Sequence, residues 1–133
     1  MSYNTVVAGL HARLATVPGL IAVLDYVPTS VQDCPIVWSA LDSMKIAHTG
    51  TIKTVTYRIL HRVAIRWQDN EQAELEAIPL VDAIPAAVEA DPQLGGRIIT
   101  GWAEVDECQP GWATIAGAEY RLLDFYSTVI EKS

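Results

Sequence analysis

Residues 54–67 read T-V-T-Y-R-I-L-H-R-V-A-I-R-W, and this stretch decides the fold. Successive side chains of a strand point to opposite faces, so apolar residues at every second position predict a β-strand. One face carries Val55, Tyr57, Ile59, His61, Val63, Ile65 and Trp67. The other face carries Thr54, Thr56, Arg58, Leu60, Arg62, Ala64 and Arg66. We expect the first face to pack against helices, and the second, with its three arginines, to contact another surface.

Two stretches have the three-and-four residue spacing of an amphipathic helix. The first is Thr5 to Val17, with Asn4 as N-cap and Pro18-Gly19 as stop. The second begins after Asp69, which forms a capping box with Gln72 three residues later. We expect the following side chains to form its buried stripe: Leu75, Ile78, Val81, Ile84 and Val88. We also expect Pro79 and Pro85 to kink the helix or to end it near Ile84.

Further strands are predicted on both sides of the central one. Their ranges are Leu20–Tyr26, Ile36–Leu41, Ile98–Cys108, Trp112–Ile115 and Glu119–Glu131. Asp42 to Lys53 is expected to be a polar connection, longer than a usual hairpin loop. We interpret its tip, with Lys45, His48 and Lys53, as an arm that reaches a neighbour. The whole predicts one α+β domain spanning residues 1–133, a mainly antiparallel or mixed sheet with two helices packed on one face.

Composition restricts the function. A chain of 133 residues is long enough to bury roughly 65 to 70% of its unfolded surface in a single core. A net charge of −7 argues against nucleic acid or anionic lipid as the main ligand, because binding a polyanion needs clustered Lys and Arg. Five of the nine basic residues nevertheless lie between Lys45 and Arg66. This asymmetry favours a surface that binds protein.

Catalytic, metal and cofactor motifs are missing from the sequence. Cys34 and Cys108 have no metal spacing and are expected to be reduced thiols, and His11 is expected at the surface. Glu104, Asp106 and Glu107 are the nearest candidates for acid and base roles. Pairing of Glu104 and Asp106 with the arginines across strands or between subunits is the simpler interpretation. We therefore expect no enzyme activity and no cofactor.

The second face of the sheet is the candidate interface. Its apolar members are Leu60, Trp102, Leu122, Tyr126 and Ile130. A patch in which apolar and charged side chains alternate is typical of protein interfaces and favours a homo-oligomer. The residues we expect at a subunit or tail interface are Arg58, Arg62, Arg66, Trp102, Glu104, Asp106 and Tyr126. No basic segment precedes the first apolar stretch and no apolar run reaches 18 residues, so we expect the protein to be made in the cytoplasm and to have no membrane partner.

Several motifs, taken in order, resemble one family. They are VPGL at residues 17–20, DYVPTSVQDCP at 25–35, LVDAIPAAVEADPQLGG at 80–96 and GWATIAGAEYRLLDFYSTVIE at 111–131. Together they resemble the small tail-terminator, or tail-completion, proteins of long-tailed bacteriophages. The most specific pieces are Asp91-Pro92-x-Leu94-Gly95-Gly96 and the closing Gly117-x-x-Tyr120 strand. Ala118 stands where the pattern has a second glycine.

The resemblance implies a structural virion protein without catalysis or cofactor. It implies a hexameric ring at the head-proximal end of the tail, which stops polymerisation of the tail tube protein and joins the tail to the head connector, with DNA only passing through. Other classes stay open at this point. They are a head-completion or connector adaptor of the neck, a small cytosolic enzyme, and a host-derived interaction module.

Overall fold

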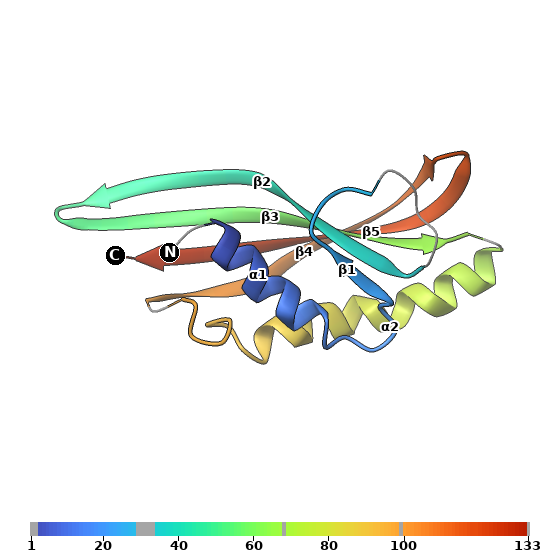
Figure 1. Ribbon diagram of the computed structural model, residues 1–133, viewed down its shortest axis with the longest axis horizontal. Coiled ribbons are helices and arrows are strands. Elements are labelled where there is room, and N and C mark those ends of the chain that lie inside the picture. The colour runs from blue at the N-terminus through green and yellow to red at the C-terminus, as the bar shows by residue number, and fades with distance from the viewer. Residues whose placement is uncertain (1–2, 29–33, 68, 99, 133) are drawn as a thin grey trace.

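The computed structural model describes residues 3–28, 34–67, 69–98 and 100–132. Its elements are α1 (Tyr3–Leu14), β1 (Ala22–Leu24), β2 (Ile36–Thr49), β3 (Ile52–Arg66), α2 (Asn70–Glu89), β4 (Gly101–Ile115) and β5 (Ala118–Lys132). The strands form one sheet in the order β1-β2-β3-β5-β4, in which only the β1 and β2 pair is parallel. Both helices lie along the same side of it (Figure 1). The predicted α+β class is confirmed.

Strand β3 is central, as its sequence predicts. It is flanked by β2 and β5, and its odd-numbered residues from Tyr57 to Ile65 are buried. The helices pack side chains against these residues: Leu10 and Leu14 from α1, and Leu80 and Ile84 from α2. Each fully buried side chain of this size stabilises the fold by about 1.5–3 kcal/mol relative to exposure. The pattern of residues 54–67 therefore fixes which side of the sheet the helices cover.

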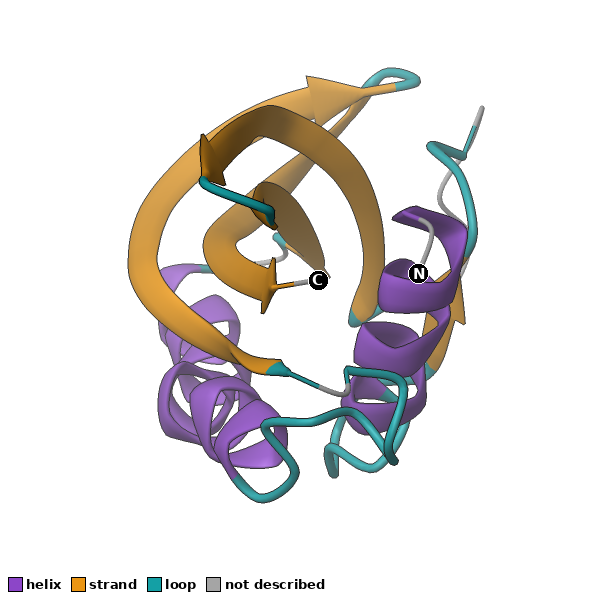
Figure 2. Ribbon diagram, turned by 90° about the vertical axis from the view of Figure 1, so that its left-hand side faces the viewer, coloured by secondary structure: helices purple, strands orange, loops and turns teal. Residues whose placement is uncertain are grey.

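The opposite side of the sheet has a smaller core of its own. It consists of Ile36, Trp38, Ala64, Tyr120 and Leu122. The sheet is strongly coiled (Figure 2), and β1 and Cys34 pack against these residues. Leu122 is 5% exposed, so its expected place on an open interface is wrong. Coiling, which the alternating pattern does not show, closes this end of the face.

The expected polar connection from Asp42 to Lys53 is also wrong. Strand β2 continues to Thr49, and only Gly50 and Thr51 separate it from β3. Gly50 supplies the positive φ of +63° that such a tight turn needs. A bulge between Leu41 and Ser43 shifts the alternation of β2 by one residue, which hides the strand in the sequence.

Strand β4 is continuous where two strands were expected. It passes through Pro110 and Gly111 and has a bulge between Val105 and Glu107. Because β4 is an edge strand, the missing N–H of Pro110 can face solvent without breaking the ladder. The bulge reverses which face each later residue of β4 points to.

Helix α2 is one helix of 20 residues despite its prolines. Asp69 caps it as predicted, with the carboxylate accepting a hydrogen bond of 2.8 Å from the Gln72 N–H. The Gln72 side chain completes no reciprocal bond in that cap; it donates to Glu76 instead. Neither Pro79 nor Pro85 ends the helix, which continues to Glu89. Neither helix described here is long and apolar enough to cross a membrane.

The buried stripe of α2 agrees with the expected one at Ile84 and Val88 and differs at the other positions. The residues packed on the sheet side are Ala73, Ala77, Leu80, Ile84 and Val88. Leu75, Ile78 and Val81 are exposed, with Ile78 at 61%. Both stripes have helical spacing, and alanines at the contact allow the helix axis to approach the sheet closely. An apolar helix face is therefore left open.

Smaller differences concern the ends of elements. Helix α1 begins at Tyr3, so Asn4 lies inside the helix, and it ends at Leu14. The first strand is only Ala22–Leu24, whereas the last is Ala118–Lys132, close to its predicted range. Cys34 and Cys108 are reduced, as expected. Of the segment between Pro28 and Pro35, which its two prolines predict to be irregular, residues 29–33 lie outside the described part.

Candidate interaction surface

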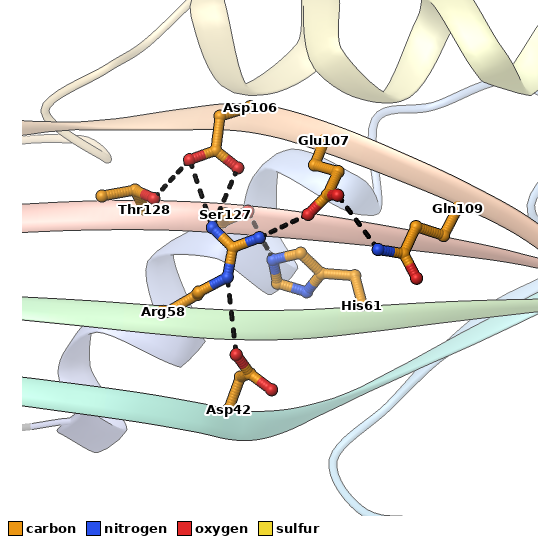
Figure 3. Close-up of polar contacts among 8 residues, drawn as sticks. All are labelled: Asp42, Arg58, His61, Asp106, Glu107, Gln109, Ser127 and Thr128. Carbon is orange, nitrogen blue, oxygen red and sulfur yellow. Dashed lines mark hydrogen bonds and ion pairs between the residues drawn. The ribbon is translucent and has the colours of Figure 1, made fainter.

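Arg58 is the centre of an ion-pair cluster on the helix-free side of the sheet (Figure 3). Its Nε lies 3.4 Å from Asp42 and its Nη1 lies 3.3 Å from Asp106. Its Nη2 donates to Glu107, and its guanidinium lies 4.6 Å from the ring centre of Tyr126. The structure thus brings together three of the predicted interface residues, Arg58, Asp106 and Tyr126. It adds two acids, Asp42 and Glu107.

The two bulges explain why the acids converge. Asp42 is the extra residue of the bulge in β2, and Asp106 is the extra residue of the bulge in β4. A bulge re-aims the side chains around it. Strand β5 separates β3 from β4, and Thr128 on β5 donates to Asp106 at 2.6 Å. Arg58 therefore connects β2, β3 and β4 across four strands of the sheet.

The other predicted charges are placed differently. Arg62 forms a two-pronged ion pair with Asp124 at 2.8 and 2.9 Å. The hydrogen bond that Arg62 donates to Asp124 raises the pKa of Arg62, because it stabilises the charged guanidinium. Arg66 and Glu104 are exposed and form no ion pair within the described residues. Trp102 is also exposed on this side.

Arg58 and Arg62 both have their acidic partners within the same chain. The Arg58 cluster is about one third to two fifths exposed, and surface ion pairs of this kind contribute about 0–1 kcal/mol each. Three carboxylates around one guanidinium also leave the cluster net negative. A contact between subunits carried by Arg58 and Asp106 would compete with their present partners.

A second set of polar side chains, which the sequence analysis missed, forms a hydrogen-bonded network in the core between the sheet and the helices. His61 is fully buried, and its two ring nitrogens lie 2.6 Å from Ser39 Oγ and 2.7 Å from Ser127 Oγ. Ser39 Oγ is also 2.9 Å from His11 Nε2, and His11 Nδ1 is 3.5 Å from Asp25. The result is a continuous chain from Asp25 to Ser127.

His11 is not a surface residue, contrary to expectation. Its side chain is only 11% exposed, because α1 places it over Ser39 of β2. Burial lowers the pKa of His11, against the opposing effect of Asp25. Burial, with a smaller contribution from His11, lowers the pKa of His61 to about 3. Both rings are therefore neutral near pH 7.

One arrangement of protons satisfies every member of this chain. Ser127 donates to His61 Nε2, and His61 Nδ1–H donates to Ser39. Ser39 then donates to His11 Nε2, which leaves His11 Nδ1–H directed at Asp25. Buried polar groups that are fully paired in this way make a core specific to one packing.

The order of Asp25, His11 and Ser39 resembles a serine hydrolase triad. However, Ser39 Oγ lies within hydrogen-bonding distance of both His11 and His61, and these two contacts occupy the hydroxyl. Asp25 is exposed and its oxygen is 3.5 Å from the ring. The arrangement fits a structural role better than a nucleophilic one.

The hairpin formed by β2 and β3 carries the predicted arm residues. We define the arm as residues 43–56; it extends beyond α1 at one end of the molecule (Figure 1). Lys45, His48 and Lys53 are all exposed there. Three apolar side chains, Met44, Ile46 and Ile52, are also about half exposed. The arm is thus an ordered hairpin with an apolar surface, not a polar loop.

Helix α2 has the second exposed apolar surface, at the other end of the molecule. We define the α2 face as Leu75, Ile78 and Val81 with the exposed acids Glu71 and Asp82. A hollow of about 280 Å³ adjoins it, between Leu75 and Pro79 on the helix and Pro18 and Pro35 opposite. The sequence signal for this face was the second helical stripe, which we assigned to the core.

Within the described residues, no group of His, Cys, Asp and Glu side chains is arranged to hold a metal ion. A scan against models of known protein families finds no match to this chain. A search of curated proteins also finds no match.

Proposed function

We propose that this protein is a ring-forming subunit that caps the tube of a phage tail, stops its polymerisation and joins it to the head connector. The proposal combines the sequence resemblance, which spans nearly the whole chain, with one structural observation. That observation is the arm, whose exposed apolar side chains and open edge strand favour contact with another protein.

The argument from the arm is energetic. Only the tip of the arm, residues 48–53, is two-stranded, because β5 pairs with β3 from Thr54 onward. A two-stranded hairpin is marginally stable in water unless it packs against something. Here the arm holds Met44, Ile46 and Ile52 about half exposed. Among the described residues, its outer strand has no neighbour beyond Trp38, where the pairing with β1 ends. Long edge strands with exposed apolar side chains tend to pair with other chains, so the arm supports assembly.

The charge of the chain supports a ring through which DNA passes. At a net charge of −7 the chain repels phosphates, and most of the central arginine charge is already paired with acids. Such a ring surrounds DNA without binding it tightly. The proposed partners are further copies of the chain, the tail tube protein and the head connector.

The test uses tail tubes and DNA-filled heads lacking tails. Purified protein is added to polymerising tail tube protein, and tube length and tube ends are recorded by electron microscopy. We expect a ring at one end of each tube and an end to elongation. Tubes that keep growing with bare ends would overturn the proposal. Binding to heads but not to tubes would also overturn it, in favour of a connector adaptor.

A further inference from the structure

We propose that the arm of one copy docks on the α2 face of a second copy. The inference deepens the proposed function and rests on it only for the closure of these contacts into a ring. The occupant of the α2 face is therefore another molecule of this chain.

The two surfaces are complementary in charge. The arm has two lysines, Lys45 and Lys53, and no acid. Lys53 lies on the side of the arm that carries Met44 and Ile46, and Lys45 lies on the other side. Helix α2 has five acids and no basic residue. Glu74 is drawn toward the sheet by Arg121 at 3.0 Å, whereas Glu71 and Asp82 are exposed beside the apolar stripe. Opposite charge around apolar centres is typical of protein interfaces and selects the partner.

The side of the arm that would dock follows from the strand register. Met44 pairs with Tyr57, and Ile46 pairs with Val55, so their side chains share the helix side of the sheet. The pair of His48 and Lys53 lies on the same side, nearer the turn. This side presents two apolar side chains followed by basic ones. The α2 face offers the matching set, Leu75 and Ile78 beside Glu71 and Asp82.

The positions of the two surfaces determine how copies associate. The turn of the arm lies at one end of the long axis, and the beginning of α2 lies at the other end (Figure 1). They cannot meet within one molecule. A contact between two different surfaces is head-to-tail, and it repeats into a ring if the rotation between copies closes and into an open filament if it does not.

Charge also disfavours the symmetric alternatives. Two arms placed together on this side would oppose Lys53 to Lys53, and two α2 faces would oppose acids to acids. Like charges at an interface weaken association. The combination of arm with α2 face is the one that pairs opposite charges.

The experiment uses one disruptive substitution on each surface. Ile46→Asp damages the arm, and Ile78→Asp damages the α2 face; both side chains are exposed, so the fold is retained and is verified by circular dichroism. Val27→Asp is the matched control, because Val27 and Ile78 are both 61% exposed. We expect light scattering to give monomers for Ile46→Asp and Ile78→Asp, and wild-type assembly for Val27→Asp.

Mixing the two variants identifies the contact. Ile46→Asp keeps an intact α2 face and Ile78→Asp keeps an intact arm, so an equimolar mixture contains one functional pair of surfaces. We expect the mixture to give a species of twice the chain mass and nothing larger. A mixture that stays monomeric would overturn the inference, because an arm-to-arm or other contact is not restored by mixing.

Other outcomes separate this inference from the proposed function. Rings that cap tail tubes but persist in Ile78→Asp would overturn the contact and leave the function standing. Assembly that is lost in both variants and restored by mixing, without capping of tubes, would support the contact and overturn the function. A wild-type protein that is monomeric at every concentration would overturn the contact.

Discussion

The neutral, buried His61 should make the fold sensitive to mild acid. Its pKa is about 3 in the folded protein, well below the ordinary value near 6.5 that applies when the chain is unfolded. Between these values the unfolded chain binds a proton that the folded chain does not. The free energy of unfolding therefore falls as the pH is lowered through 6.5.

The magnitude follows from the difference in proton binding. Between pH 7 and pH 5 the unfolded histidine moves about 1.5 pH units past its midpoint, and each unit corresponds to about 1.4 kcal/mol. We expect a loss of about 2 kcal/mol from His61 over this interval. The lowered pKa of His11 adds a loss of the same sign. Carboxylates contribute little because they titrate mainly below pH 5.

The assay is urea-induced unfolding at pH 7, 6 and 5, at one protein concentration because association adds to apparent stability. His61→Gln can still donate and accept hydrogen bonds between Ser39 and Ser127 but cannot titrate, so we expect it to lose most of the dependence on pH. His48→Gln is the control, since His48 is exposed on the arm. Equal slopes for the wild type and His61→Gln would refute the reasoning.

Three further predictions concern stability. Arg58→Ala should lower the free energy of unfolding by about 1–2 kcal/mol, because it leaves three carboxylates together. The control Arg66→Ala, at an exposed site, should change the free energy of unfolding by less than about 0.5 kcal/mol. Urea unfolding at low and high salt compares the two variants, and an equal effect of both would contradict the role of the cluster. Pro79→Ala should stabilise the chain by about 1–2 kcal/mol, because it permits the missing hydrogen bond of the helix; a lower melting temperature would count against this account of α2. Gly101→Ala should lower the free energy of unfolding by more than about 3 kcal/mol, because an added Cβ would lie 1.8 Å from the Ile130 carbonyl oxygen at a φ of +142°. Gly111→Ala is the control, because the added Cβ has open space there and should be tolerated. Thermal unfolding compares the two variants, and equal melting temperatures would contradict the close approach at Gly101.

The sheet could be predicted from sequence as far as its alternation was regular. Residues 54–67 showed both the strand and its buried side, and the last strand was predicted almost to its ends. The alternation failed at Asp42 and Asp106, where a bulge adds one residue and reverses the phase. A single inserted residue is invisible to a search for a period of two, so the arm was taken for a loop.

The helix face was misassigned for a different reason. Helix α2 has two apolar stripes of nearly equal quality, and hydrophobicity alone favours the larger side chains Leu75 and Ile78. The fold instead buries Ala73 and Ala77, because small residues allow close packing on the sheet. Only the sheet geometry decides between the stripes, and that information is not local.

The polar contacts were partly predictable. The shared face of Arg58 and Asp106 was expected from alternation, although the pairing crosses β5 and depends on the bulge. The partners of His61 could have been sought on the same principle. Ser127 interrupts the apolar side of β5 formed by Phe125 and Val129, and a buried histidine requires such a partner.

The most direct measurement for the proposed assembly is the mass of the purified protein in solution, by light scattering over a concentration series and then by negative-stain imaging, alone and with tail tubes. The account predicts a species of about six times the 14.5 kDa chain mass, with a central hole, that also appears at tube ends. A monomer at every concentration that leaves added tubes bare and growing would contradict it.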